Sequence, residues 1–221
     1  MSSPPTFVHI VESPSSLDLL DGRTEGRSLS AFLDLAEIPN SYCLATDSET
    51  FALAMNDRLF DGINKHEAFP LIHLSTHGNK NEIALTNNHR ISWDSLAGEL
   101  SPINQAMNGL LVVCLSACQG ISANNMVWKS AQLPMKTLVA SRGDVGWHEA
   151  AVAFATFYNH FLKLDKTVEE SVNAMKAASG RDDFMGSDSE QLRDKIEQLR
   201  SIPLDKLKEL LQASIDRKND A

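Results

Sequence analysis

The run Leu110–Gly120, with the sequence LLVVCLSACQG, decides how the chain is interpreted. Its apolar residues predict a buried strand over Leu110–Leu115, and this strand leads directly to Cys118. A second apolar run, Leu71–Ser75, leads in the same way to His77. The sequence therefore places a thiol and an imidazole at the ends of two strands roughly forty residues apart, an arrangement typical of a cysteine nucleophile and its proton-transfer partner.

Further apolar runs alternate with helical patterns along the chain. Additional strands are predicted at Phe7–Val11, Tyr42–Ala45 and Thr137–Ala140. Apolar residues at spacings of three and four predict helices at Leu29–Glu37, Ser48–Leu59, Asp94–Leu100, Asn124–Ser130 and throughout the chain from Trp147 onward. Asn87 and Asn88 predict the turn of a β-hairpin. We expect an α/β fold with a mostly parallel sheet, packed on both faces by helices, in which ligands bind at the carboxyl ends of the strands.

Several boundaries follow from local signals. Ser28 is expected to cap the first helix, and the segment containing Pro102 is expected to be a loop. Thr167 and Glu170 form a capping-box pattern at the start of a late helix. Gly180–Ser189, rich in Gly, Asp and Ser, is expected to be an exposed loop.

Composition indicates one domain and a soluble protein. The chain has 221 residues, 43% of them apolar, and a formal charge of −9 without any cluster of Lys or Arg, which argues against nucleic-acid and anionic-membrane partners. No apolar stretch approaches the ~20 residues that span a bilayer, so we expect a cytoplasmic location. We expect the body of the domain at residues 1–186 and a helical extension at 187–221, with Pro203 at the start of its second helix.

The residues around the two strand ends also resemble those of a known family. The segment Ser116–Gly120 differs at one position from the caspase-type signature Q-A-C-[RQG]-G, and Ser75–Gly78 supplies a strand followed by His-Gly. Thr137–Ser179 resembles the third segment of CHAT-type proteases, so that the similarity covers Leu71–Ala178. The chain thus resembles CHAT-domain proteins of the caspase and separase clan.

This resemblance implies a cysteine endopeptidase on a caspase-like three-layer α/β/α sandwich that uses no cofactor. Cys118 is then the nucleophile, and His77 protonates the leaving amine. The backbone N–H groups of Gly78 and Cys118 are expected to stabilise the oxyanion. The family also implies a protein or peptide substrate and control by an activating partner, frequently in prokaryotic antiviral defence or programmed cell death.

Other assignments of single residues stay open. Asp144, after the strand Thr137–Ala140, is either a substrate-binding acid that favours Lys or Arg before the scissile bond, or the cap of the helix near Trp147. Asp47 is more simply a helix cap than a substrate contact. A zinc site is disfavoured because His73 and His77, like Cys114 and Cys118, lie four residues apart on a strand, which separates them by about 13 Å.

Two other functions remain as alternatives. One is a caspase-like interaction module whose dyad is silent and whose charged terminal helices dock a partner. The other is an acyl hydrolase or transferase that acts on a small molecule, because thiol chemistry also serves esters and thioesters. Cys43 and Cys114 lie in apolar runs and are expected to be buried, which argues against a disulfide framework.

Overall fold

The computed structural model describes residues 5–201. Its strands are β1 (Thr6–Ser13), β2 (Asn40–Leu44), β3 (Phe69–Gly78), β4 (Glu82–Ala84), β5 (Arg90–Ser92), β6 (Val112–Ser116), β7 (Thr137–Ser141) and β8 (Phe184–Asp188). Its α-helices are α1 (Ser16–Leu20), α2 (Glu25–Leu35), α3 (Ser48–Leu53), α4 (Leu59–His66), α5 (Trp93–Ala106), α6 (Asn125–Lys129), α7 (Trp147–Tyr158), α8 (Val168–Ser179) and α9 (Ser189–Ser201). Short π or 3₁₀ turns occupy η1 (Ala54–Arg58), η2 (Gly120–Asn124) and η3 (Asn159–Lys163).

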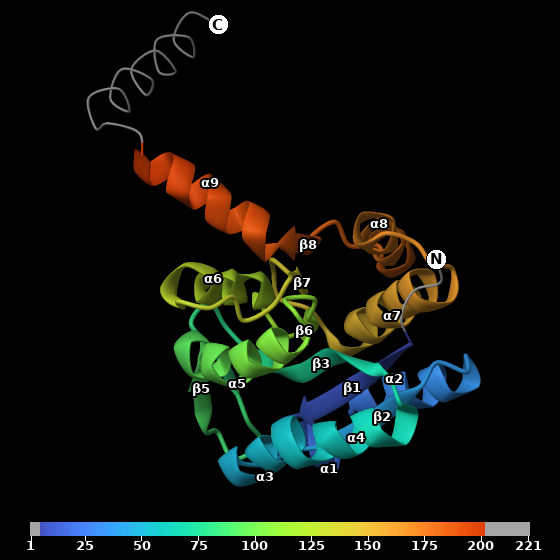
Figure 1. Ribbon diagram of the computed structural model, residues 1–221. Coiled ribbons are helices and arrows are strands. Elements are labelled where there is room, and N and C mark those ends of the chain that lie inside the picture. The colour runs from blue at the N-terminus through green and yellow to red at the C-terminus, as the bar shows by residue number, and fades with distance from the viewer. Residues whose placement is uncertain (1–4, 202–221) are drawn as a thin grey trace, which may run out of the picture.

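The strands form one mixed sheet that is mostly parallel (Figure 1). Its order is β2-β1-β3-β6-β7-β8, in which the first five strands are parallel and β8 pairs antiparallel with β7. The expected hairpin is present as β4 and β5, where β4 pairs with the end of β3 and Asn88 takes a positive φ of 65° in the turn. The predicted α/β class and the predominance of parallel strands are confirmed.

Helices cover both faces of the sheet, and each face has its own apolar core. On one face, α2, α7 and α8 bury their apolar side chains against alternate strand residues. This core contains Val8, Ile10, Leu29, Leu33, Leu71, Cys114, Val139, Phe154, Phe157 and Met175. The opposite face packs against α3, α4, α5 and α6 through Phe7, Met55, Ile72, Leu96, Leu100, Val113, Met126 and Leu138. Alternate residues of each central strand therefore point to opposite cores, which explains their nearly continuous apolar runs.

The helix α2 begins at Glu25 and not after Ser28, so that the predicted cap is wrong. The N-cap position is Thr24, whose side chain makes no capping bond. Instead, the buried carboxylate of Glu12 on β1 accepts the backbone N–H groups of Gly26 at 2.8 Å and Arg27 at 3.1 Å. The cap comes from a neighbouring strand, and a local sequence pattern does not reveal it.

The expected helix Ser48–Leu59 is divided by the π turn η1. The ring Nε2 of the buried His9 lies 2.9 Å from the carbonyl oxygen of Ala54, the first residue of that turn. Its other nitrogen, Nδ1, lies 2.8 Å from the Ser41 hydroxyl. A side chain that bonds a helix carbonyl is one of the usual causes of such a distortion. The predicted helix cap at Asp47 and the predicted capping box at Thr167 are both confirmed.

Two segments expected to be loops are regular structure. Pro102 lies inside α5, which continues to Ala106 because Leu100, Ile103 and Asn104 still pack inward. The strand β8 lies within the expected loop Gly180–Ser189, so the chain after Trp147 is not wholly helical. The expected boundary at 186/187 falls inside this strand. The first terminal helix is present as α9, and the second, predicted from Pro203, lies outside the described residues.

Candidate functional site

The ends of β3 and β6 bring His77 and Cys118 to the same edge of the sheet. The two strands are parallel neighbours, and their last register pair is Ser75 with Ser116. His77 and Cys118 each follow this pair by two residues. Contact between the two segments is direct, because a Cβ added at Gly78 would lie 3.0 Å from the Cβ of Ala117 and 3.4 Å from the carbonyl oxygen of Cys118. The structure therefore brings the segments that carry His77 and Cys118 together at one edge of the sheet.

Cys118 sits on a tight turn that the loop after β7 supports. Its Sγ lies 3.9 Å from the carbonyl oxygen of Val145, and the side chain is half-buried. Gln119 takes a positive φ of 55° and donates its backbone N–H to the carbonyl of Gly143 at 2.9 Å. Gly120 allows the turn to pack closely, since a Cβ there would lie 3.1 Å from the carbonyl oxygen of Leu115. The thiol thus has a fixed position at the strand end.

His77 is oriented by Asp18, a residue that the sequence did not single out. The ring Nε2 lies 3.0 Å from Asp18 Oδ2, and the Trp147 ring packs edge-on against the imidazole with 5.1 Å between ring centroids. An ionised carboxylate only accepts hydrogen bonds, so Nε2 carries the proton in this contact. Nδ1 is then the nitrogen left to exchange a proton with the reacting groups.

The environment of Asp18 favours its ionised form. Partial burial raises the pKa of this carboxyl, but hydrogen bonds from Ser15, His77 and Trp147 outweigh burial and hold the pKa below its ordinary value. The Ser15 hydroxyl donates to Oδ2 at 2.6 Å, and Arg23 Nε lies 3.4 Å from Oδ1. The sequence signal that could have revealed Asp18 is the pattern Ser15-x-x-Asp18, typical of the first turn of a helix, within a segment that otherwise resembles a loop.

Asp144 lies in the loop that supports Cys118. Its side chain is exposed, and Oδ1 accepts a hydrogen bond from Gln119 Nε2 at 3.3 Å. It does not cap α7, because Gly146 holds the N-cap position and donates its N–H to Glu149 Oε2 at 2.9 Å. The interpretation of Asp144 as a helix cap is therefore wrong, and its carboxylate remains available beside the turn of the candidate nucleophile.

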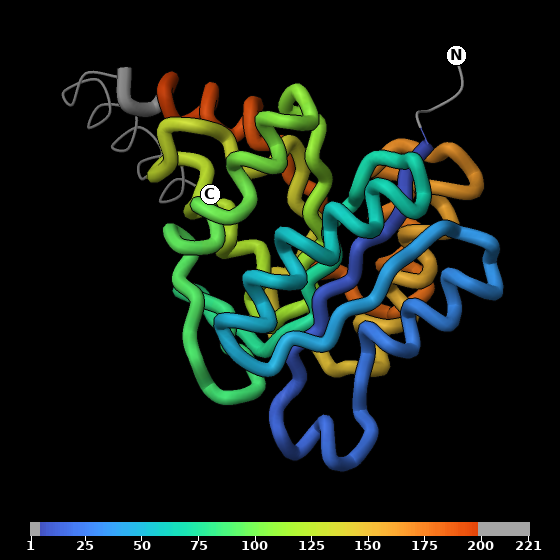
Figure 2. Tube along the Cα trace, turned by 60° about the horizontal axis from the view of Figure 1, so that its bottom comes forward, coloured from blue at the N-terminus to red at the C-terminus, as the bar shows by residue number. Residues whose placement is uncertain are grey.

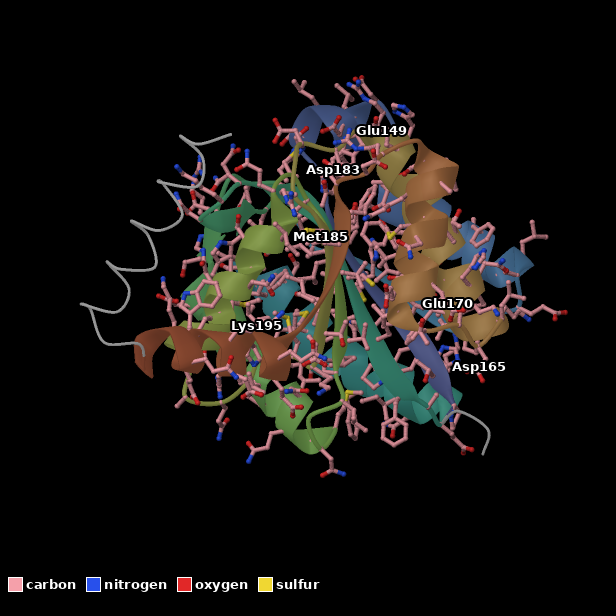
Figure 3. All side chains as sticks on the ribbon, turned by 90° about the horizontal axis from the view of Figure 1, so that it is seen from above. Glu149, Asp165, Glu170, Asp183, Met185 and Lys195 are labelled. Atoms are coloured by element: carbon pink, nitrogen blue, oxygen red, sulfur yellow. The ribbon has the colours of Figure 1, made fainter. Side chains whose placement is uncertain are left out.

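A hydrogen-bond network centred on Arg181 holds the loop that carries Asp144 in place. The guanidinium donates to the carbonyl oxygen of Asp144 at 2.7 Å, to Glu149 Oε2 at 2.9 Å and to Asp183 Oδ2 at 2.7 Å. Asp183 in turn accepts the backbone N–H of Gly143 at 3.2 Å. Figure 3 shows Glu149 and Asp183 close together at one end of the sheet. Arg181 and Asp183 were missed because they come shortly before β8, in the segment that sequence patterns favoured as a loop.

Polar side chains also lie in the layer of the sheet beneath the dyad. Glu12, Ser75 and Ser116 occupy one row across β1, β3 and β6 and are all buried. One layer deeper, His73 is fully buried, with Nδ1 2.8 Å from the Tyr158 hydroxyl and Nε2 3.5 Å from Glu25 Oε2. His73 is thus a core residue, and it does not reach the site edge.

Two kinds of feature, a metal-binding cluster and a membrane-spanning helix, do not occur in the described part of the chain. Among residues 5–201, no group of three or more His, Cys, Asp or Glu side chains is arranged to hold a metal ion. Within the same residues, no helix combines the length and the apolar character needed to span a bilayer.

Comparison with models of known protein families and with curated protein sequences gives no match to this chain. The fold and site define an α/β protein with a Cys–His pair at the carboxyl edge of its sheet.

Proposed function

We propose that this protein is a cysteine endopeptidase of the CHAT type, in the caspase and separase clan, which hydrolyses peptide bonds of a protein substrate. The observation that carries the proposal is the packing of Gly78 on Ala117 and Cys118, which makes His77 and Cys118 neighbours at two parallel strand ends. The contact of Asp18 with His77 adds support, since an oriented imidazole is what a thiol nucleophile requires.

The chemistry follows from this geometry. Cys118 gives its thiol proton to Nδ1 of His77, and the resulting thiolate attacks the carbonyl carbon of the scissile bond, while N–H groups such as those of Gly78 and Cys118 stabilise the oxyanion. His77 gives its Nδ1 proton to the leaving amine, which breaks the C–N bond and leaves a thioester on Cys118. Water then loses a proton to His77 and attacks the thioester, which releases the carboxylic acid and restores the thiol. Asp18 is a positioning residue that keeps the proton on Nε2 and stabilises the imidazolium.

Library hydrolysis tests the proposal. The full chain is incubated with internally quenched peptides that vary every position, and products are identified by mass spectrometry. Cleavage is expected for the wild type, with a loss of at least about 10³-fold in Cys118→Ala and in His77→Ala. Cys43→Ala, at a half-buried cysteine on β2, is the matched control and should retain activity. Equal cleavage by Cys118→Ala would overturn the mechanism.

The substrate preference proposed for Asp144 is tested in the same library. Its exposed carboxylate next to Gln119 favours Lys or Arg before the scissile bond. Asp144→Asn should lose this preference, while Asp182→Asn, at another exposed acid near the Arg181 network, should keep it. A basic preference that survives Asp144→Asn would assign specificity to other residues.

Control by a partner is part of the proposal, as in other CHAT-type proteases. The helix α9 is tied to the body of the domain, since Arg193 donates to the carbonyl oxygens of Val127 at 2.8 Å and Ser130 at 3.0 Å. Because residue 187 lies inside β8, a truncation that tests the terminal region should remove only residues after Ser201, which keeps this strand intact.

If peptides remain uncut and peptide electrophiles do not label Cys118, even with a partner, the interaction-module alternative is favoured.

A further inference from the structure

The short helix α1 presents apolar side chains to solvent next to the candidate site. Leu17 is 70% exposed and Leu20 is 80% exposed. The two lie three residues apart on a helix and therefore share one side of it. Single exposed leucines are common on protein surfaces, but a pair on one short element is an apolar surface that a ligand can cover. We call this pair the α1 leucine surface.

The α1 leucine surface is attached to the dyad by its own helix. Asp18 lies between the two leucines in the sequence and contacts His77 at 3.0 Å. The helix is held by Ser15, whose hydroxyl donates to Asp18 at 2.6 Å, and by Ser16, whose hydroxyl donates to the carbonyl of Thr86 at 3.3 Å. In Figure 2 the segment between β1 and α2, drawn in blue, projects from the body of the protein. The leucines therefore have a set position on the helix whose Asp18 contacts the imidazole.

The size of the surface indicates what covers it. Two leucines one helical turn apart are separated by about 5 Å, whereas an extended peptide places side chains on one side every ~6.6 Å, so the pair accommodates one large side chain. Stable protein–protein interfaces bury about 800 Å² on each partner, far more than two leucines provide. An extended polypeptide that already passes the dyad is thus the occupant that fits, in preference to a regulatory protein or a second copy of the chain.

We propose that Leu17 and Leu20 bind a large apolar side chain of the substrate, such as Leu, Met or Phe, near the scissile bond. This inference rests on the proposed peptidase function and names a feature of its substrates. Since Asp18 contacts the imidazole directly, the apolar residue lies within about three residues of the bond that is cut, at ~3.3 Å for each extended residue.

The test compares Leu17→Ser/Leu20→Ser with Leu35→Ser in the quenched-peptide library. Leu35 is 85% exposed on α2 and serves as the matched control. The wild type and Leu35→Ser should prefer Leu, Met or Phe over Ser at one position by about tenfold, and the double variant should lose most of that preference. An unchanged preference in the double variant, or no apolar preference in the wild type, would overturn the proposal.

A binding measurement separates this inference from the proposed function. The Cys118→Ala variant, with ¹³C-labelled leucine methyl groups, is titrated with two sets of library peptides that carry either Leu or Ser at the preferred position. If the wild type cuts no peptide in the library, the titration uses an equimolar pool of the Leu peptides and the matching pool of Ser peptides. Shifts of the Leu17 and Leu20 methyl signals with the Leu peptides alone support docking even if no peptide is cut, which would refute only the peptidase. Cleavage by the wild type without such shifts would refute only the docking surface. The absence of both cleavage and shifts would refute both.

Discussion

His77 Nε2 and Asp18 Oδ2 lie 3.0 Å apart, which joins the end of β3 to a short helix after β1. We expect Asp18→Asn to lower kcat by roughly 100-fold or more with a smaller change in KM, because the amide can donate to Nε2 and select the wrong tautomer. The ¹⁵N chemical shifts of the His77 ring should show the proton moving from Nε2. Asp21→Asn, at an exposed acid on the same segment, is the control. Wild-type kinetics in Asp18→Asn would rule out the positioning role.

The three cysteines should differ strongly in reactivity. Burial raises the pKa of the Cys114 thiol to about 12 and also raises the pKa of Cys43, so neither forms much thiolate near neutral pH. Cys118 lies half-buried at the sheet edge that also carries His77. Iodoacetamide followed by peptide mapping should modify Cys118 at least about tenfold faster than Cys43, and Cys114 only after unfolding. Faster modification of Cys43 would contradict the assignment of Cys118 as nucleophile.

Two glycines in helices should respond in opposite directions to alanine. In α2, a Cβ at Gly26 would lie 3.0 Å from both Glu12 Cβ and Ile10 Cγ2, so Gly26→Ala should force the helix off β1 and destabilise the fold by about 1–3 kcal/mol. In α5, a Cβ at Gly98 meets no atom within 4 Å apart from its chain neighbours and the backbone of its own helix, and Gly98→Ala should stabilise the fold by about 0.5–1 kcal/mol. Urea unfolding of both variants measures the contrast, and equal effects would contradict this packing of α2 on β1.

Acid should weaken the fold through His9. Burial lowers the pKa of this imidazole, although the bond to the Ala54 carbonyl partly opposes the shift. Below the unfolded-state pKa of about 6.5 the unfolded chain binds the proton first, so the contribution of His9 to stability is lost as the pH falls toward its lower folded-state pKa. Urea midpoints at pH 7.5 and pH 5.5 should differ less in His9→Gln than in the wild type. An identical pH dependence in both would contradict the role of His9.

The contribution of Glu12 to stability changes with pH in the opposite direction to that of His9. Burial raises its pKa, while bonds from Tyr42, Gly26 and Arg27 oppose the increase. Between the ordinary carboxyl pKa and this raised value the folded state holds the extra proton, so the contribution of Glu12 to stability decreases as the pH rises through that range. The acid response of His9 is therefore measured best as a difference between variant and wild type, in which the contribution of Glu12 cancels.

The central strands and the two site residues were predictable because their signals are local. Apolar runs that end in His77 and Cys118 specify β3 and β6, and parallel pairing then places both residues at one edge. The helix α2 could not be bounded in this way, because its cap is the carboxylate of Glu12 on another strand. The role of Asp18 was not predicted for a related reason, since it depends on contact with His77, which lies 59 residues away in the sequence.

The missed strand β8 shows the limit of periodicity. Its five residues, Phe184–Asp188, include a single fully buried side chain, that of Phe184, and a glycine at 186, so the apolar alternation that identifies a strand is absent. The strand forms because β7 offers an open edge and Arg181 anchors the approach through Asp183. Pairing with β7 therefore outweighs the low local strand propensity of these residues. The same arrangement supports the loop beside Cys118.

Detection of an acyl-enzyme tests the central claim most directly. The best substrate from the peptide library is mixed with the protein, the reaction is quenched in acid within its first turnover, and the intact mass and peptide map are recorded. The account predicts an added mass equal to the acyl half of the substrate, bound to Cys118 as a thioester, and no such adduct in Cys118→Ala. Cleavage that proceeds without an adduct, and equally in Cys118→Ala, would contradict it.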